Sequence, residues 1–76
     1  MRLSKAEYDR IEKQILNVVN NSSQPATTSE VSRVVHKSYP FTQKVLDKLE
    51  TKKEIAKKKY ADRTFYFNKL LKHNFM

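Results

Sequence analysis

Residues 30–55 are EVSRVVHKSYPFTQKVLDKLETKKEI, and this stretch decides the fold. Its apolar residues recur at the spacing of one helical face. In the first half they are Val31, Val34 and Val35, and in the second half Phe41, Val45, Leu46 and Leu49. Between them, Pro40 disfavours helical geometry in the residue before it but suits a first helical turn. The stretch therefore predicts two helices joined by a tight turn, at residues 28–37 and 40–52.

Upstream of this stretch, two capping patterns mark helix starts. Thr27-Thr28-Ser29-Glu30 and Ser4-Lys5-Ala6-Glu7 each have a hydroxyl residue first and an acidic residue fourth, the arrangement of a capping box. Apolar residues follow the second pattern at helical spacing, and they are Tyr8, Ile11, Ile15, Leu16, Val18 and Val19. Residues 20–25 favour turns. We therefore expect a first helix over residues 4–20 and a polar loop before the second helix.

Downstream of the stretch, residues 54–60 and 64–67 have strand-favouring side chains and predict a β-hairpin over residues 54–67. The intervening residues lack glycine and asparagine, so a tight type I′ turn is unfavourable. We expect a connection of three or four residues and leave the strand register open. A short chain needs its large apolar side chains in the core. We therefore expect Phe65 and Phe67 to cover the helices.

Length and composition fit one domain. Seventy-six residues allow a single small core, so we expect a mostly-α α+β domain over residues 1–76, with three helices and a C-terminal hairpin. Residues 68–76 are a short tail, and we expect Leu70, Leu71 and Phe75 to pack on the body or to form a homodimer contact. No segment approaches the roughly 20 apolar residues of a membrane span. A charged amphipathic pattern begins at once, so we expect no signal peptide and an intracellular location: nucleoid, nucleus or cytoplasm.

Charge gives the first indication of function. The chain has 16 Lys and Arg against eight Asp and Glu, a formal net charge of +8. Residues 1–43 carry six basic and four acidic groups, a net of +2, whereas residues 44–76 carry ten and four, a net of +6. A basic half of this kind favours a polyanionic partner, most commonly nucleic acid. A solvated lysine-rich surface without a partner is the alternative.

The order and spacing of these motifs resemble the winged helix-turn-helix superfamily. Glu30-Val31-Ser32 stands where many members have a Glu-Ile-Ala-like opening of the second helix. Leu46, Leu49 and Glu50 match the L-x-x-L-E of the recognition helix, and Ile55 begins the wing. Lys53 stands where the family usually has glycine, so it must either adopt a left-handed conformation or end the helix differently. The resemblance implies a winged-helix fold that binds double-stranded DNA.

A second likeness is to the N-terminal winged-helix domain of meiotic homologous-pairing proteins. The matching residues lie in the third helix and the hairpin, and they are Lys44 to Leu49, Ile55, Lys58, Tyr60, Tyr66 and Phe67. Those proteins continue into a coiled coil that this sequence lacks, so no recombination role is inferred. By size, the chain is equally similar to small bacterial and phage winged-helix regulators. We therefore expect a small transcriptional regulator.

In such a fold the recognition helix enters the major groove with its N-terminal residues foremost. The residues expected to contact DNA from this helix are Tyr39, Thr42, Gln43, Lys44 and Lys48. Gln43 is the candidate for base reading, because an amide can pair with adenine in two directions. Thr42 is expected at a thymine methyl group or a phosphate. Asp47 would accept from cytosine, pair with a lysine or turn away, and each polar residue also fits a plain solvent-facing position.

The hairpin is expected to hold the DNA backbone through Lys57, Lys58, Lys59 and Arg63. Side chains alternate between the faces of a strand, so either Lys58 alone or Lys57 with Lys59 points to a given side. Arg63, near the tip, would grip a phosphate or enter a minor groove. These contacts are electrostatic, so binding should weaken steeply with salt.

Other functions remain as alternatives. A winged helix can be a protein-interaction module in a larger complex or an architectural DNA binder without sequence preference. The aromatic residues Tyr60, Phe65, Tyr66 and Phe67 would stack unpaired bases if they were exposed, although a core role is favoured. An enzyme is not expected, because His36 and His73 stand apart from any catalytic constellation. With no cysteine and no glycine, neither a thiolate metal site nor a phosphate-cradling loop is expected, nor a cofactor or small-molecule ligand.

Overall fold

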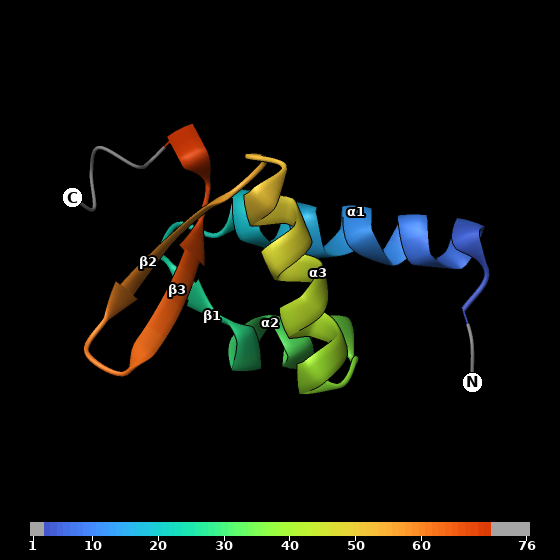
Figure 1. The fold of residues 1–76 in the computed structure, drawn as a ribbon, viewed down its shortest axis with the longest axis horizontal. Helices are drawn as coiled ribbons and strands as arrows, with labels where there is room; N and C mark the ends of the chain where they lie inside the picture. Colours follow the sequence, from blue (N-terminus) through green and yellow to red (C-terminus); the bar gives the residue numbers. More distant parts are fainter. Residues whose placement is uncertain (1–2, 71–76) are drawn as a thin grey trace.

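The structure is a computed structural model that describes residues 3–70 (Figure 1). Its helices are α1 (Lys5–Asn21), α2 (Thr28–Val35) and α3 (Tyr39–Thr51), and its strands are β1 (Ala26–Thr27), β2 (Ala56–Tyr60) and β3 (Arg63–Phe67). The strands form one antiparallel sheet in the order β1-β3-β2. The architecture is therefore the predicted mostly-α α+β, winged-helix-like arrangement. The strand β1 was not predicted, and it lies in the segment expected to be a loop and a cap.

The helices begin at residues with capping side chains. Ser4 accepts a hydrogen bond from the backbone N–H of Glu7 and caps α1, as predicted. Thr27 caps α2 in a capping box, in which Glu30 N donates to the threonine hydroxyl at 3.3 Å and Thr27 N donates to the glutamate at 3.2 Å. Ser38 caps α3, so this helix begins one residue before the predicted start. Local sequence thus fixes each start within one residue.

Left-handed residues end the second and third helices. His36 has φ 58°, so α2 ends at Val35 and not at residue 37 as predicted. Lys53 has φ 63°, which is the left-handed alternative expected from its position in place of glycine. After α3, Lys53 N donates to Glu50 O at 2.9 Å and Glu54 N donates to Leu49 O at 3.0 Å. These two bonds satisfy carbonyls at the end of α3 in a Schellman motif.

Helices α2 and α3 bury the same spacing of side chains. The buried residues are Thr28, Val31, Ser32 and Val35 in α2, and Thr42, Val45, Leu46 and Leu49 in α3. Each set follows the i, i+3, i+4, i+7 pattern of one helical face. Val34 was expected on the apolar face but is 58% exposed, because it stands outside that pattern.

The hairpin is tighter than predicted. Tyr60 pairs directly with Arg63, so the connection between β2 and β3 has two residues and not three or four. Of the two, only Ala61 has a positive φ, 56°. A type I′ turn needs positive φ at both positions, so the expectation that this turn type is absent is confirmed.

The sheet places a tyrosine, and not the two phenylalanines, against the helices. Tyr66 is 1% exposed and belongs to the core with Ile15, Val31 and Leu46. Because side chains alternate along β3, Phe65 and Phe67 lie on the opposite face of the sheet. The prediction that they cover the helices is therefore wrong. Tyr8 is the aromatic partner of Phe41, with their rings edge to face at 5.8 Å.

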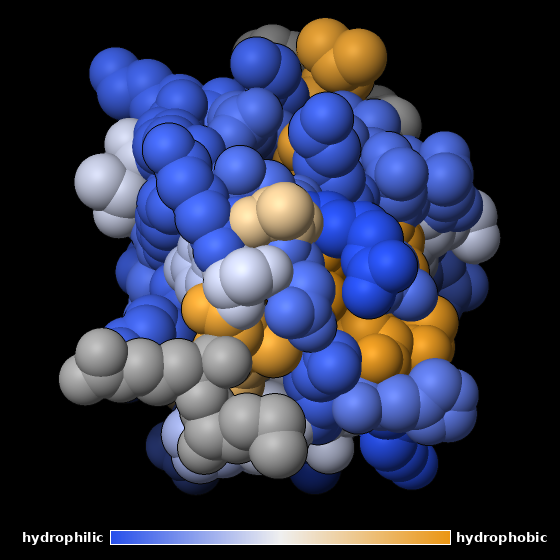
Figure 2. Space-filling view, turned by 90° about the vertical axis from the view of Figure 1, so that its right-hand side faces the viewer, coloured by the Kyte–Doolittle hydropathy of each residue, from blue (hydrophilic) through white to orange (hydrophobic). Residues whose placement is uncertain are grey.

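The outer surface of the helical body is mainly polar. Figure 2, which looks at the side on which α1 begins, shows a mostly hydrophilic face interrupted by smaller hydrophobic areas. Apolar side chains that pack on the outside of the core remain partly exposed, and they are Leu3, Tyr8, Leu16, Val18 and Phe41. No helix within residues 3–70 has the length and apolar character needed to cross a membrane.

Candidate nucleic-acid interface

The solvent face of α3 holds only part of the predicted set. Tyr39 is 54% exposed at the start of the helix, and Lys44 and Lys48 are exposed along it. Thr42 is fully buried, so the prediction that it contacts DNA is wrong. Thr42 stands in the i, i+3, i+4, i+7 pattern with Val45 and Leu49, and this spacing indicated burial. The prediction placed Thr42 in solvent because its side chain is polar.

Gln43 is held in a polar network inside the domain. Its side-chain carbonyl accepts from the Thr28 hydroxyl at 2.7 Å. Its amide nitrogen donates to the Tyr66 hydroxyl oxygen at 2.6 Å and to the Asp47 carboxylate at 3.0 Å. Both polar groups of the amide are thus occupied, and base reading would require these bonds to break. The structure therefore counts against Gln43 as the base-reading residue. Instead, the Gln43 side chain links α2, α3 and β3.

Tyr66 and Asp47 complete this network. The Tyr66 hydroxyl donates to the Asp47 carboxylate at 3.0 Å. Burial, together with this bond and the charge of Asp47, raises the pKa of Tyr66 to about 12, although the bond from Gln43 acts in the opposite direction. Asp47 therefore bonds to Gln43 and Tyr66 within the domain, and it pairs with no lysine among the described residues.

Two lysines of the α3 region converge on one glutamate of α1. The Lys48 and Lys52 ammonium groups each lie 3.1 Å from a Glu12 carboxylate oxygen. The Lys48 nitrogen also lies 4.9 Å from the centre of the Tyr8 ring. Partial burial opposes ionisation of Glu12, but hydrogen bonds from both lysines hold its pKa below the ordinary value. Lys48 is thus exposed but already paired, which reduces its availability to a phosphate.

The strand register decides the directions of the hairpin lysines. Directly opposite residues share a sheet face, and Lys57 pairs with Tyr66 while Lys59 pairs with Thr64. Lys57 and Lys59 therefore lie on the helix-facing side, where the Lys57 ammonium group is 3.6 Å from Glu50 of α3. Lys58 pairs with Phe65 on the outer side. The structure thus separates the three predicted lysines, two to one side and one to the other.

A polar cleft of about 560 Å³ lies between α2, the start of α3 and the end of the hairpin. Arg33, Tyr39 and Arg63 line it together with Gln43 and two acidic residues, Glu30 and Asp62. The Glu30 carboxylate is occupied at the α2 cap. Within residues 3–70, neither arginine forms an ion pair. Arg33 was not predicted as a site residue, and its only signal in the sequence is its charge.

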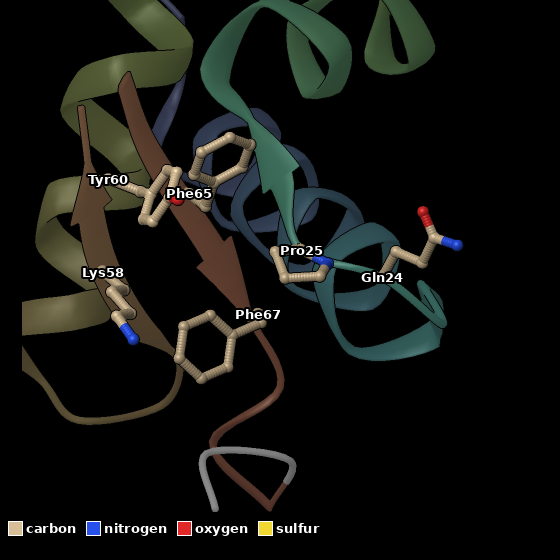
Figure 3. Close-up of a pocket in the computed structure, with 6 residues that line it drawn as sticks. All are labelled: Gln24, Pro25, Lys58, Tyr60, Phe65 and Phe67. Carbon is tan, nitrogen blue, oxygen red and sulfur yellow. The ribbon is translucent and has the colours of Figure 1, made fainter. Parts of the chain in front are cut away.

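A second depression, the outer groove, lies on the far side of the sheet and has a volume of about 550 Å³ (Figure 3). It is lined by Gln24, Pro25, Lys58, Tyr60, Phe65 and Phe67. Tyr60 is 72% exposed, Phe65 is half-buried and Phe67 is buried. Of the four aromatic residues considered for base stacking, Tyr66 alone faces the helices.

No group of three or more potential metal ligands is found within the described residues. His36 is exposed at the end of α2, where its left-handed backbone has a structural role. His73, Leu71 and Phe75 lie outside the described residues, and so does most of the predicted tail. Leu70, the remaining apolar tail residue considered for packing, is 79% exposed.

Comparisons with known proteins support the fold alone. No protein-family model matches the sequence, and no curated protein matches it either. Among solved structures, the chain is similar to human N-acetylserotonin methyltransferase in complex with SAM, with a TM-score of 0.71 and 20% sequence identity. The similarity covers 86% of this chain and 19% of the methyltransferase chain. The domain therefore has a fold that also occurs as a minor part of a larger enzyme.

Proposed function

We propose that this domain binds double-stranded DNA, with the exposed start of α3 in the major groove and the hairpin end on the backbone. The observation that supports this most is that arginines from two elements, α2 and β3, line one cleft beside the start of α3. These are Arg33 and Arg63, and Lys44 adds a third basic group on α3, outside the lining of the cleft. All three basic residues are exposed.

Base contacts in this proposal come from few residues. Tyr39 and Lys44 are exposed on the first turns of α3 and can approach base edges. Phosphates would be held by Arg33, Lys59 and Arg63, since most protein–DNA hydrogen bonds go to the backbone. Because Gln43 is occupied by its network, we expect modest sequence preference. A small transcriptional regulator is the proposed role, and an architectural binder would show no preference at all.

The test is a titration of fluorescently labelled duplex DNA followed by anisotropy at low and at physiological salt. We expect micromolar or tighter binding at low salt, with a log–log salt slope of about −4 to −5 if four to six phosphates are contacted. Competition with random duplex then distinguishes a regulator from an architectural binder. Absence of binding at low salt would contradict the proposal.

The alternative is a protein-interaction module in a larger assembly. It is favoured by the likeness to a segment that makes up 19% of an enzyme chain, and by the exposure of Val34 and Leu70. This function predicts weak duplex binding that does not depend on sequence. It also predicts that Lys44→Glu has little effect on the weak duplex binding, since the exposed apolar residues Val34 and Leu70 would be the ones that contact the partner.

A further inference from the structure

The outer groove combines aromatic rings with one cationic side chain. The register places Lys58, Tyr60, Phe65 and Phe67 on the same face of the hairpin, because Lys58 pairs with Phe65 and side chains alternate along each strand. Pro25 lies next to β1, on the side of β3 that is opposite to β2. In Figure 3, Tyr60 and Phe65 project at one end of the groove and Phe67 lies at the other. The groove is thus a shallow aromatic surface with an exposed tyrosine at its edge.

The charges around the groove indicate the ligand. Lys58 is the one charged residue that lines it, and no carboxylate does so. Arg63, which lines the cleft and not this groove, pairs directly with Tyr60 across the hairpin, so a second basic residue stands next to the edge of the groove. A planar aromatic ligand with an attached negative charge complements this arrangement, and a nucleobase with its phosphate has that chemistry. Aromatic side chains beside basic groups are the recurrent means by which proteins bind single strands.

We infer that the outer groove binds unpaired nucleobases of single-stranded nucleic acid, with Tyr60 and Phe65 stacking on a base and Lys58 near its phosphate. The inference extends the proposed nucleic-acid function to a second surface. A paired base inside a duplex is stacked on both faces and cannot enter the groove. The outer groove and the cleft on the helix side therefore take different forms of nucleic acid, and Arg63 lies between them.

The experiment compares two tyrosine variants of the full chain on two probes. The probes are a labelled single strand of about ten thymidines and a labelled duplex of mixed sequence. Tyr60→Ala removes the exposed ring of the outer groove, and Tyr39→Ala removes an exposed tyrosine of the cleft. We expect Tyr60→Ala to weaken single-strand binding about fivefold or more, the lower end of the effect of one lost stacking contact, with duplex binding unchanged. Tyr39→Ala should give the reverse pattern.

A second readout reports stacking directly. The chain has four tyrosines and no tryptophan, so its intrinsic fluorescence comes from tyrosine. Stacking of a base on Tyr60 should quench part of that emission, and Tyr60→Ala should abolish the quenching by the single strand. Circular dichroism melts establish that both variants remain folded, and Tyr60→Phe, which keeps the ring, should bind the single strand like the wild type.

The outcomes separate this inference from the proposed function. If the duplex binds and the single strand binds equally well to the wild type and Tyr60→Ala, the inference is wrong while the proposed function stands. The same conclusion follows if Tyr60→Ala weakens both probes equally. If the single strand binds through Tyr60 and the duplex does not bind, the inference stands and the duplex proposal is wrong. A groove that takes a polypeptide segment would leave the single-strand titration insensitive to Tyr60.

Discussion

The amide nitrogen of Gln43 lies 2.6 Å from the hydroxyl oxygen of Tyr66, and this hydrogen bond joins α3 to the middle strand of the sheet. Since the carbonyl of the same amide accepts from Thr28, one side chain connects three elements. The residue best suited by type to read a base is therefore used to fix the orientation of α3 relative to the hairpin.

Tyr66→Phe should destabilise the domain. The change removes the hydroxyl that donates to Asp47 and accepts from Gln43, which leaves two polar groups without this partner. Loss of one partner of a partly buried bond costs about 1–3 kcal/mol, which lowers the melting temperature of a small domain by several degrees. Urea denaturation measures the free energy of unfolding. Tyr39→Phe, at an exposed tyrosine, is the matched control and should have no effect.

Alkaline pH should weaken the same part of the structure. The pKa of Tyr66 is raised from its ordinary value of 10.0 to about 12 in the folded state. A group with a raised folded-state pKa contributes its full stability below the unfolded value and loses it as the pH rises through the folded value. The free energy of unfolding should therefore fall between pH 10 and 12. A Tyr66→Phe protein that lost the same amount over this range would contradict the assignment.

Glu12→Gln should loosen the contact between α1 and α3. It removes the carboxylate that Lys48 and Lys52 share at 3.1 Å each. Lys48 loses its anion, whereas Lys52 keeps a second ion pair with Glu54 at 3.5 Å. We expect a loss of about 1 kcal/mol at neutral pH, as for partly exposed ion pairs. The pKa of Glu12 is lowered, so this contribution is complete above the ordinary value of 4.5 and disappears as the pH falls below it. Asp9→Asn, an exposed change on α1, should show no such difference.

Lys53→Gly should stabilise the domain. Lys53 has φ 63°, a conformation that costs a non-glycine residue about 1–2 kcal/mol, whereas glycine adopts it freely but loses more backbone entropy on folding. We expect a net gain of about 0.5–1 kcal/mol. Thr51→Gly, in the last turn of α3, should destabilise by about 0.3 kcal/mol, the difference in helix propensity between threonine and glycine, because its backbone is helical. Equal signs for the two variants in thermal melts would rule out the left-handed assignment.

Lys44→Glu should weaken duplex binding and leave the melt unchanged. Lys44 is exposed on α3 and has no ion pair within the described residues, so reversing its charge affects the proposed interface but no packing contact. The salt slope should become smaller in magnitude, because the interface then carries less positive charge and releases fewer counterions from the DNA. Lys13→Glu makes the same charge change on α1 and serves as the control. If both variants weakened binding equally, the net charge and not this face would be responsible.

The element types and most helix starts could be predicted from local chemistry. Ser4 and Thr27 accept hydrogen bonds from the free N–H groups at their helix starts. The left-handed conformation of Lys53 was one of the two alternatives that its position in place of glycine left open. The burial of Thr42 was also encoded in helical spacing, but a polar side chain in the apolar pattern was interpreted as solvent-facing. Local patterns also failed at the hairpin connection, which has two residues and not three or four, and at the end of α2.

By itself, the sequence determined three helices, a basic hairpin and their order, because capping, helical periodicity and turn chemistry act between residues close along the chain. Only the tertiary structure decided that Tyr66 faces the helices, that β1 completes the sheet and that Gln43 is occupied internally. The physical reason is that strand side chains alternate with a period of two, so a single-residue difference in register exchanges the two faces. Register and long-range hydrogen bonds depend on partners that are distant in sequence. The register also decides which hairpin side chains face the helices and which face the outer groove.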